Sequence, residues 1–182
     1  MKELSLNVLD IVQNSLTAGA DLVQITVEES GQAGSLVIEI EDNGCGMSAE
    51  VVQAVTDPFY TTRATRNVGM GLPLFKMAAE QTGGSLDLWS EQGVGTRVTA
   101  RFVTSHVDMT PLGDINGTVS MLILTNPNLD FVFRHTTDKG GLELDTRQMR
   151  EILGDVPLDH PDVTQWMREY LRDGADGMGE KT

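Results

Sequence analysis

Hydrophobic and polar residues follow two different periods in the first part of the chain. Residues 4–18 place apolar side chains every three or four positions, the period of an amphipathic helix, and Ser15 continues the apolar row. Residues 23–27 and 36–40 alternate apolar and polar side chains one by one, which is typical of half-buried strands. The turn-rich sequence between these two stretches predicts a hairpin.

The same reasoning predicts the remaining elements. Before residue 104 we expect a helix over 49–55 capped by Ser48, a loop over 57–68, a helix over 72–81, and strands over 85–90 and 97–103. After it we expect an apolar hairpin from the runs 119–124 and 131–133, then helices over 146–153 and 162–171. Turn formers after residue 104 suggest a boundary. The predicted domains are therefore 1–104, a small α+β extension over 105–173, and a disordered tail over 174–182.

Composition and charge restrict the classes of function. The 182 residues are 40% hydrophobic and 22% charged, which is ordinary for a globular protein, and no run approaches the roughly 20 apolar residues of a membrane span. The N-terminus lacks a signal-peptide pattern, and the single cysteine, Cys45, excludes a disulfide framework, so we expect a cytoplasmic protein. A net charge of −14 disfavours nucleic acid as a partner.

The first predicted helix carries a carboxylate and an amide on one face. Asp10 and Asn14 are one helical turn apart, so their side chains lie side by side. A polar stripe is most often a solvated face. In company with other site residues, the Asn14 amide oxygen suits Mg²⁺, and the Asp10 carboxylate suits a general base.

Three glycine-containing segments complete the candidate chemistry. The first, Asp-Asn-Gly-Cys-Gly-Met at 42–47, follows a strand: Asp42 could accept a hydrogen bond from the adenine amine, and Gly44 and Gly46 would let the backbone approach a flat base. Asp-Asn-Gly is also ordinary turn chemistry. We expect Cys45, inside this turn, to be a small buried residue.

The second and third segments would hold the phosphates and the base. A loop with Arg63 leads into Gly69 and Gly71 before a helix, whose free N–H groups suit phosphates. A solvated loop arginine is the alternative for Arg63. In the turn Gly-Val-Gly-Thr, the Thr96 hydroxyl could complete the adenine contacts, although the turn alone is common.

Five motifs occur together in a fixed order: LDIVQNSLTAGA, DNGCGM, DPFYTTR, NVGMGLPL and GVGT. Their order and spacing over about residues 3–103 resemble those of the GHKL ATPase superfamily, which includes histidine kinases, DNA gyrase B and MutL. The short segment between the third and fourth motifs is most similar to histidine-kinase ATP-binding domains. The resemblance implies a two-layer α/β sandwich of the Bergerat type within an α+β fold, with ATP and Mg²⁺ as ligands. It also implies that Asn14 coordinates Mg²⁺, Asp42 reads adenine, Gly44, Gly46, Gly69 and Gly71 shape the pocket, and Thr96 supports the base.

The sequence departs from the family pattern at three points. Asp10 stands where hydrolysing members carry a longer Glu, and Pro73 replaces a usual glycine. No obvious four-helix dimerisation and phosphoacceptor domain precedes the motifs, so we expect a stand-alone ATP-binding domain. The Ser-His-x-x-x-Thr-Pro-Leu stretch around His106 resembles a phosphoacceptor box, but it follows the ATP-binding motifs, and a linker histidine is the simpler interpretation. We expect His135 and His160 to be ordinary polar positions.

Three functional hypotheses follow. The preferred one is a kinase-like ATPase that phosphorylates or regulates a protein partner in signalling, with no nucleic acid or membrane partner and with a homodimer as one conceivable assembly. The second is a slow ATP hydrolase that acts as a conformational switch. The third is a nucleotide-sensing module without catalysis, in which Asp10 is too short to work.

Overall fold

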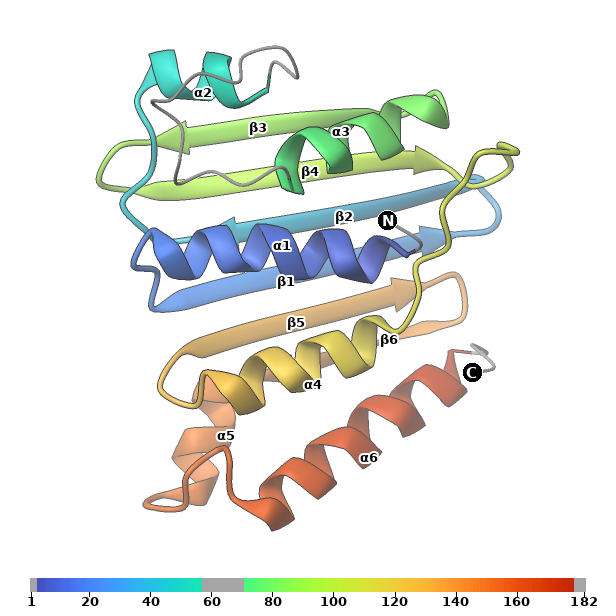
Figure 1. Cartoon of the computed structure of the whole chain (residues 1–182). Helices are drawn as coiled ribbons and strands as arrows, with labels where there is room; N and C mark the ends of the chain where they lie inside the picture. The colour runs from blue at the N-terminus through green and yellow to red at the C-terminus, as the bar shows by residue number, and fades with distance from the viewer. Residues whose placement is uncertain (1–2, 57–70, 179–182) are drawn as a thin grey trace.

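The alternating stretches of the sequence become neighbouring strands of one mixed sheet. The computed structural model describes residues 3–56 and 71–178. Its elements are α1 (Leu4–Thr17), β1 (Leu22–Ser30), β2 (Ser35–Asp42), α2 (Ala49–Val55), α3 (Gly71–Gln81), β3 (Ser85–Glu91), β4 (Gly95–Val103), α4 (Ile115–Thr125), β5 (Asp130–Thr137), β6 (Gly140–Asp145), α5 (Thr146–Leu153) and α6 (Pro161–Gly177). The strand order is β3-β4-β2-β1-β5-β6, and α1, α3 and α4 lie along one face of the sheet (Figure 1).

Strand register brings the motif residues together. In β1 and β2 every second side chain is buried, as the alternation predicts. β2 pairs antiparallel with both β1 and β4, and Asp42, at the end of β2, lies opposite Thr96 in β4. Helix α4 connects β4 to β5, and β5 pairs in parallel with β1. The arrangement is the two-layer α/β sandwich expected for a Bergerat ATPase.

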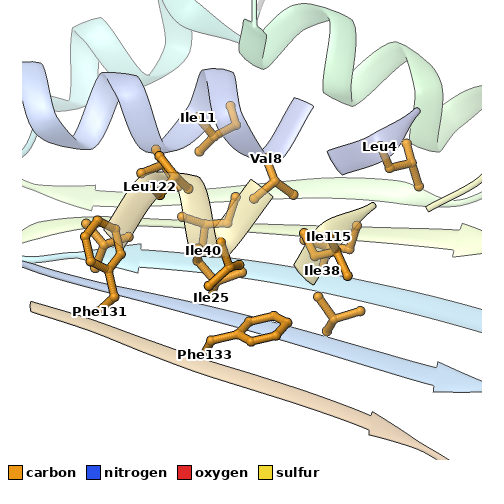
Figure 2. Close-up of a cluster of buried hydrophobic side chains, with 14 of the residues drawn as sticks. Leu4, Val8, Ile11, Ile25, Ile38, Ile40, Ile115, Leu122, Phe131 and Phe133 are labelled. Carbon is orange, nitrogen blue, oxygen red and sulfur yellow. The ribbon is translucent and has the colours of Figure 1, made fainter. Parts of the chain in front are cut away.

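The hydrophobic core lies between the helices and the sheet and spans both parts of the chain. Leu4, Val8 and Ile11 of α1 face strand residues from β1, β2 and β5, with Ile115 and Leu122 of α4 beside them (Figure 2). Residues after 104 therefore extend the same sheet and share the same core. The division into domains at residue 104 stays a prediction, and it coincides with no break in the sheet.

The run 119–124, predicted to be a strand of a hairpin, lies inside α4. Asp114 caps this helix by accepting a hydrogen bond from the Gly117 N–H at 2.8 Å. α4 contacts α1, α6 and β5, so most of its circumference is covered and its sequence shows no clear polar face. The true hairpin pairs β5 with β6, whose Gly-Gly-Leu-Glu-Leu-Asp sequence offers only two large apolar residues.

The chain end also differs from the expectation. Residues 174–177, predicted to begin a disordered tail, continue α6. Ala175 and Met178 follow Leu171 at helical spacing and are buried against the core. Residues 179–182 lie outside the described part of the chain. Within residues 3–56 and 71–178, none of the helices has the length and apolar character that a membrane crossing requires.

Candidate functional site

A cleft of about 220 Å³ lies beside α1, at the ends of β2 and β4. Asn14 of α1, Asp42 of β2 and Thr96 of β4 are among its polar lining residues, together with Ser15 and Thr17 of α1. Its apolar walls come from Ile11, Ile40, Met47, Leu72, Leu88 and Val98. A mostly apolar cleft with a few converging polar groups is the usual form of a site for a flat organic ligand.

The Asp42 carboxylate is fixed at the cleft wall by two donors. The Ser15 hydroxyl donates to Asp42 Oδ2 at 2.6 Å, and the Gly44 N–H donates to Asp42 Oδ1 at 2.9 Å. Ser15 is almost fully buried on α1, directly after Asn14. Charge-assisted hydrogen bonds of this length hold a carboxylate in one orientation, so the wall is built before any ligand arrives.

Two glycines allow the turn after β2 to pack closely. A side chain at Gly44 would lie 2.9 Å from the Ala18 Cβ, and the adjacent Cys45 N–H donates to the Ala18 carbonyl at 2.9 Å. Gly46 has φ of +67°, and a Cβ there would overlap the Glu91 carbonyl. Both positions therefore require glycine for the turn to close against α1 and the β3–β4 hairpin.

Asn43 and Cys45, which alternate with the two glycines of this turn, have different roles. The Asn43 side-chain oxygen accepts hydrogen bonds from the Asp21 and Leu22 N–H groups, both at 3.0 Å, and so ties the turn to the start of β1. Cys45 is exposed at the cleft, which corrects the expectation of a buried thiol. Its backbone is fully engaged in the turn, so the side chain points away from the packed interior.

Thr96 belongs to a small hydroxyl network. The Ser90 hydroxyl lies 2.9 Å from both the Gly95 carbonyl and the Thr96 hydroxyl, and it accepts the Met47 N–H at 2.8 Å. Because a carbonyl can only accept, Ser90 uses its single proton there, and Thr96 is then the donor to Ser90. Since no other described side chain bonds to the Thr96 hydroxyl, its lone pairs can accept a hydrogen bond from a ligand.

Asp10 and Asn14 lie at the side of the cleft that faces α3. Asn14 is half-buried, and its amide has no hydrogen-bond partner among residues 3–56 and 71–178. Asp10, one helical turn earlier, is exposed. A Cβ atom added at Gly71 would lie 2.8 Å from the Asp10 Cβ. The glycine that opens α3 therefore lets this helix start against Asp10. Arg63 and Gly69 lie outside the described residues.

The histidines differ from the expectations in part. His106 lies in a turn where its Nδ1 accepts the Asp108 N–H at 3.1 Å, so the box-like stretch forms no helix. His135 is fully buried in β5, with Nε2 2.7 Å from Glu29 Oε1. It is therefore an internal paired residue, which corrects the expectation of an ordinary polar position.

Comparison with known proteins identifies the family of the chain. The family model described as histidine kinase-, DNA gyrase B- and HSP90-like ATPase matches residues 2–106, more than half of the chain. The chain belongs to this ATPase family. It thus carries the ATP-binding type of domain that histidine kinases share.

Several of the relatives that match are sensor proteins. The chain is 35% identical over 78 residues to the sensor kinase CckA of Brucella abortus, covering 42% of this chain and 8% of that protein. It is 35% identical over 101 residues to the sensor protein SrrB of Staphylococcus aureus, covering 53% of this chain and 17% of that protein. The ATPase chain thus spans less than a fifth of these curated relatives.

A solved structure also resembles the ATPase chain along its length. The Aquifex aeolicus MutL ATPase domain, complexed with ADP, aligns with a TM-score of 0.48 and 15% identity. The alignment covers 100% of this chain and 99% of that one.

Two site residues were missed in the sequence. Ser15 sits in the apolar row of α1, and a polar residue on a buried helical face is a signal that it has an internal partner. Ser90 gave no such signal, because alternating strands carry many serines. Its role arises only from the turn geometry of residues 45–47 and 93–96.

Proposed function

We propose that the cleft binds Mg²⁺-ATP and that the chain is a kinase-like ATPase, which phosphorylates or regulates a partner protein in signalling. The observation that carries the proposal is the convergence of Asn14, Asp42 and Thr96, from three different elements, on one mostly apolar cleft. An exposed free cysteine and the need for ATP both suit the reducing cytoplasm, where we place the protein.

The adenine base would be recognised at the end of the cleft where Asp42 and Thr96 lie. The Asp42 carboxylate can accept the exocyclic amine of adenine, while Ser15 and Gly44 hold it in place. Guanine carries an oxygen where adenine carries that amine, so it would set two acceptors against each other. We therefore expect ATP to bind more tightly than GTP, and the Thr96 oxygen can support the same edge of the base.

The phosphate end of the cleft offers groups that fit a magnesium ion. The Asn14 amide oxygen is a hard neutral ligand that the described residues leave unused, and Mg²⁺ takes oxygen ligands together with phosphates. The ion would neutralise phosphate charge, which an acidic chain of net charge −14 needs. Asp10, one turn away, would accept a proton from the attacking hydroxyl or water. Arg63 remains a predicted phosphate contact, and Gly69 a residue predicted to shape the pocket.

The fate of the γ-phosphate tests the proposed activity. Wild-type protein and Asp10→Asn are incubated with γ-labelled ATP and Mg²⁺ for hours, with and without candidate response proteins. Transfer of label to a partner supports the kinase-like role. Free phosphate that disappears in Asp10→Asn identifies a hydrolase. ATP binding with neither product, in the presence of every candidate partner, contradicts the catalytic proposal and leaves a nucleotide sensor.

One observation favours the hydrolase acting as a conformational switch. The first turn of α1 is tied to the later part of the chain, since the Leu4 and Ser5 N–H groups donate to the Pro111 and Leu112 carbonyls at 2.9 and 2.8 Å. A shift of α1 on nucleotide binding would thus reach α4. Hydrogen exchange of residues 105–125 with and without ATP tests this alternative, and unchanged exchange there would exclude it.

A further inference from the structure

A surface groove of about 490 Å³ lies between the edge strand β6 and helix α6. It is at the opposite edge of the sheet from β3 and so is separate from the ATP-binding cleft (Figure 1). Its side-chain walls are Leu142, Glu143, Trp166, Glu169, Tyr170 and Asp173. Three of these residues are acids, and none of the described residues that line the groove is basic.

Two of the residues that line this groove are aromatic. Trp166 and Tyr170 are stacked with ring centroids 5.3 Å apart and planes at 17°. They are 51% and 39% exposed, although α6 already packs into the core through Met167 and Leu171. The Tyr170 hydroxyl donates to the Glu143 carbonyl at 2.7 Å, which fixes the pair against the edge strand. The rings are therefore ordered and presented to solvent without being needed for the core.

The same chain shows what such a combination of ring and carboxylate binds. At Trp89 the guanidinium carbon of Arg97 lies 5.8 Å from the ring centroid. The same guanidinium donates to both Glu41 carboxylate oxygens, at 3.0 and 3.2 Å. A planar guanidinium can stack on a ring and bind a carboxylate at once, which an ammonium does less well. Trp166 likewise shares one groove with acidic side chains.

We propose that the groove of Trp166 and Tyr170 docks an arginine-bearing segment of a partner protein. Glu169 is the free carboxylate of the site: its Oε1 accepts the Gln165 amide at 3.0 Å, and it has no ion-pair partner among the described residues. Glu143 already binds Arg134 at 2.6 Å, and Asp173 lies 3.6 Å from Arg172, so both contribute less. The net charge of −14 further attracts a basic segment. This interaction needs no nucleotide and goes beyond the proposed function.

Trp166 fluorescence can report the binding directly. The chain has 2 tryptophans, so Trp89→Phe leaves Trp166 as the single reporter. An acetylated and amidated glycine peptide with arginines, and the same peptide with lysines, are titrated into this variant. We expect a saturable change in emission with the arginine peptide and binding at least about threefold weaker with the lysine peptide, because lysine lacks the stacking plane.

Two sets of substitutions separate docking from general attraction. Glu143→Gln with Glu169→Gln and Asp173→Asn should weaken the arginine peptide at least about fivefold. The control changes the net charge equally, through the exposed acids in Glu151→Gln with Asp155→Asn and Asp159→Asn, and should change affinity less than about twofold. Circular dichroism checks folding, and Glu169→Gln alone replaces the first set if that set unfolds.

Three results would overturn the proposal. The first is the absence of a saturable signal with the arginine peptide. The second is equal weakening by both sets, or equal affinity for both peptides, which would reduce the effect to general attraction by an acidic protein. The third is a concentration-dependent change of Trp166 emission without peptide, with dimers in sedimentation, which would assign the groove to a second copy of the chain.

Discussion

The cleft beside α1 and the groove at the β6 edge use polar residues in opposite ways. At the cleft that we propose binds ATP, Asp42, Ser15 and Thr96 point inward and are fixed by hydrogen bonds before a ligand binds. At the β6 edge, Glu169 and the ring of Trp166 are exposed, with few internal partners. The first arrangement suits a small ligand that must be held in one orientation. The second suits a macromolecule that brings its own complementary groups.

The difference also explains why the cleft could be predicted from the sequence and the groove could not. The cleft is made of short local motifs, in which turn glycines and a carboxylate occur within six residues. The groove combines residues about 25 positions apart, on a strand and a helix that carry no motif. Its two walls become neighbours because α6 packs against β6.

The largest expected effect is on the stability of the hydrophobic core that the whole sheet shares. Phe133 is fully buried on β5 between α4 and the sheet (Figure 2). Phe133→Ala should lower the free energy of unfolding by about 3–5 kcal/mol, since a large buried ring leaves a cavity. Denaturant titration followed by tryptophan fluorescence measures this. The matched change Val103→Ala, at a partly exposed position, should cost far less, and equal losses would contradict a shared core.

The preorganisation of the cleft depends on a buried hydroxyl. Ser15→Ala removes the donor to Asp42 Oδ2 and should weaken ATP binding by roughly three- to tenfold, the effect of one hydrogen bond. It should also reduce the preference for ATP over GTP, which a merely structural loss would leave intact. Isothermal titration of both nucleotides provides the measurement. Ser120→Ala, a buried serine of α4 outside the cleft, is the control and should leave both affinities unchanged.

The ion pair between Asp145, at the end of β6, and Arg147 should contribute less to stability. Hydrogen bonds from the Arg147 side chain hold the pKa of Asp145 below the ordinary value of 3.8, and Asp145 also caps α5. A lowered folded-state pKa gives stability that is present above pH 3.8 and is lost as the pH falls through the folded pKa. Asp145→Asn keeps the cap and should cost about 0.5–1 kcal/mol at pH 7.

Thermal unfolding of this pair across pH checks the sign. The gap between wild type and Asp145→Asn should be constant from pH 7 down to about pH 5 and shrink below the ordinary pKa. A gap that widened on acidification would contradict the assignment. The exposed Asp155→Asn, which has no ion-pair partner among the described residues, should show no gap at any pH.

Regular periodicity and turn chemistry decided what the sequence could predict. Ser48 was recognised as the cap of α2, and its side chain does accept the Val51 N–H at 3.5 Å. The bounds of α5 also match. α4 was misassigned because a helix covered on several sides has no polar face to reveal its period. The end of α6 was missed because glycines at 174 and 177 suggested a tail, whereas burial of Ala175 and Met178 holds the helix.

The site was predicted to the extent that its residues act locally. Asn14, Asp42 and Thr96 converge as the motifs indicate, although their roles stay predictions until ligand binding is measured. The support of these residues could not be predicted in the same way. Ser90 bonds Met47 only because strand register and turn shape coincide, and no spacing in the sequence encodes that.

The central claim is that Asp42 reads the adenine of ATP, and equilibrium binding of ATP to Asp42→Ala tests it most directly. Asp87→Ala, an exposed aspartate of β3 away from the cleft, serves as the matched control. The account predicts that Asp42→Ala weakens ATP about ten- to a hundredfold, the loss of a hydrogen bond to a charged group, while Asp87→Ala leaves it unchanged. An unchanged affinity in folded Asp42→Ala would contradict the assignment of the cleft.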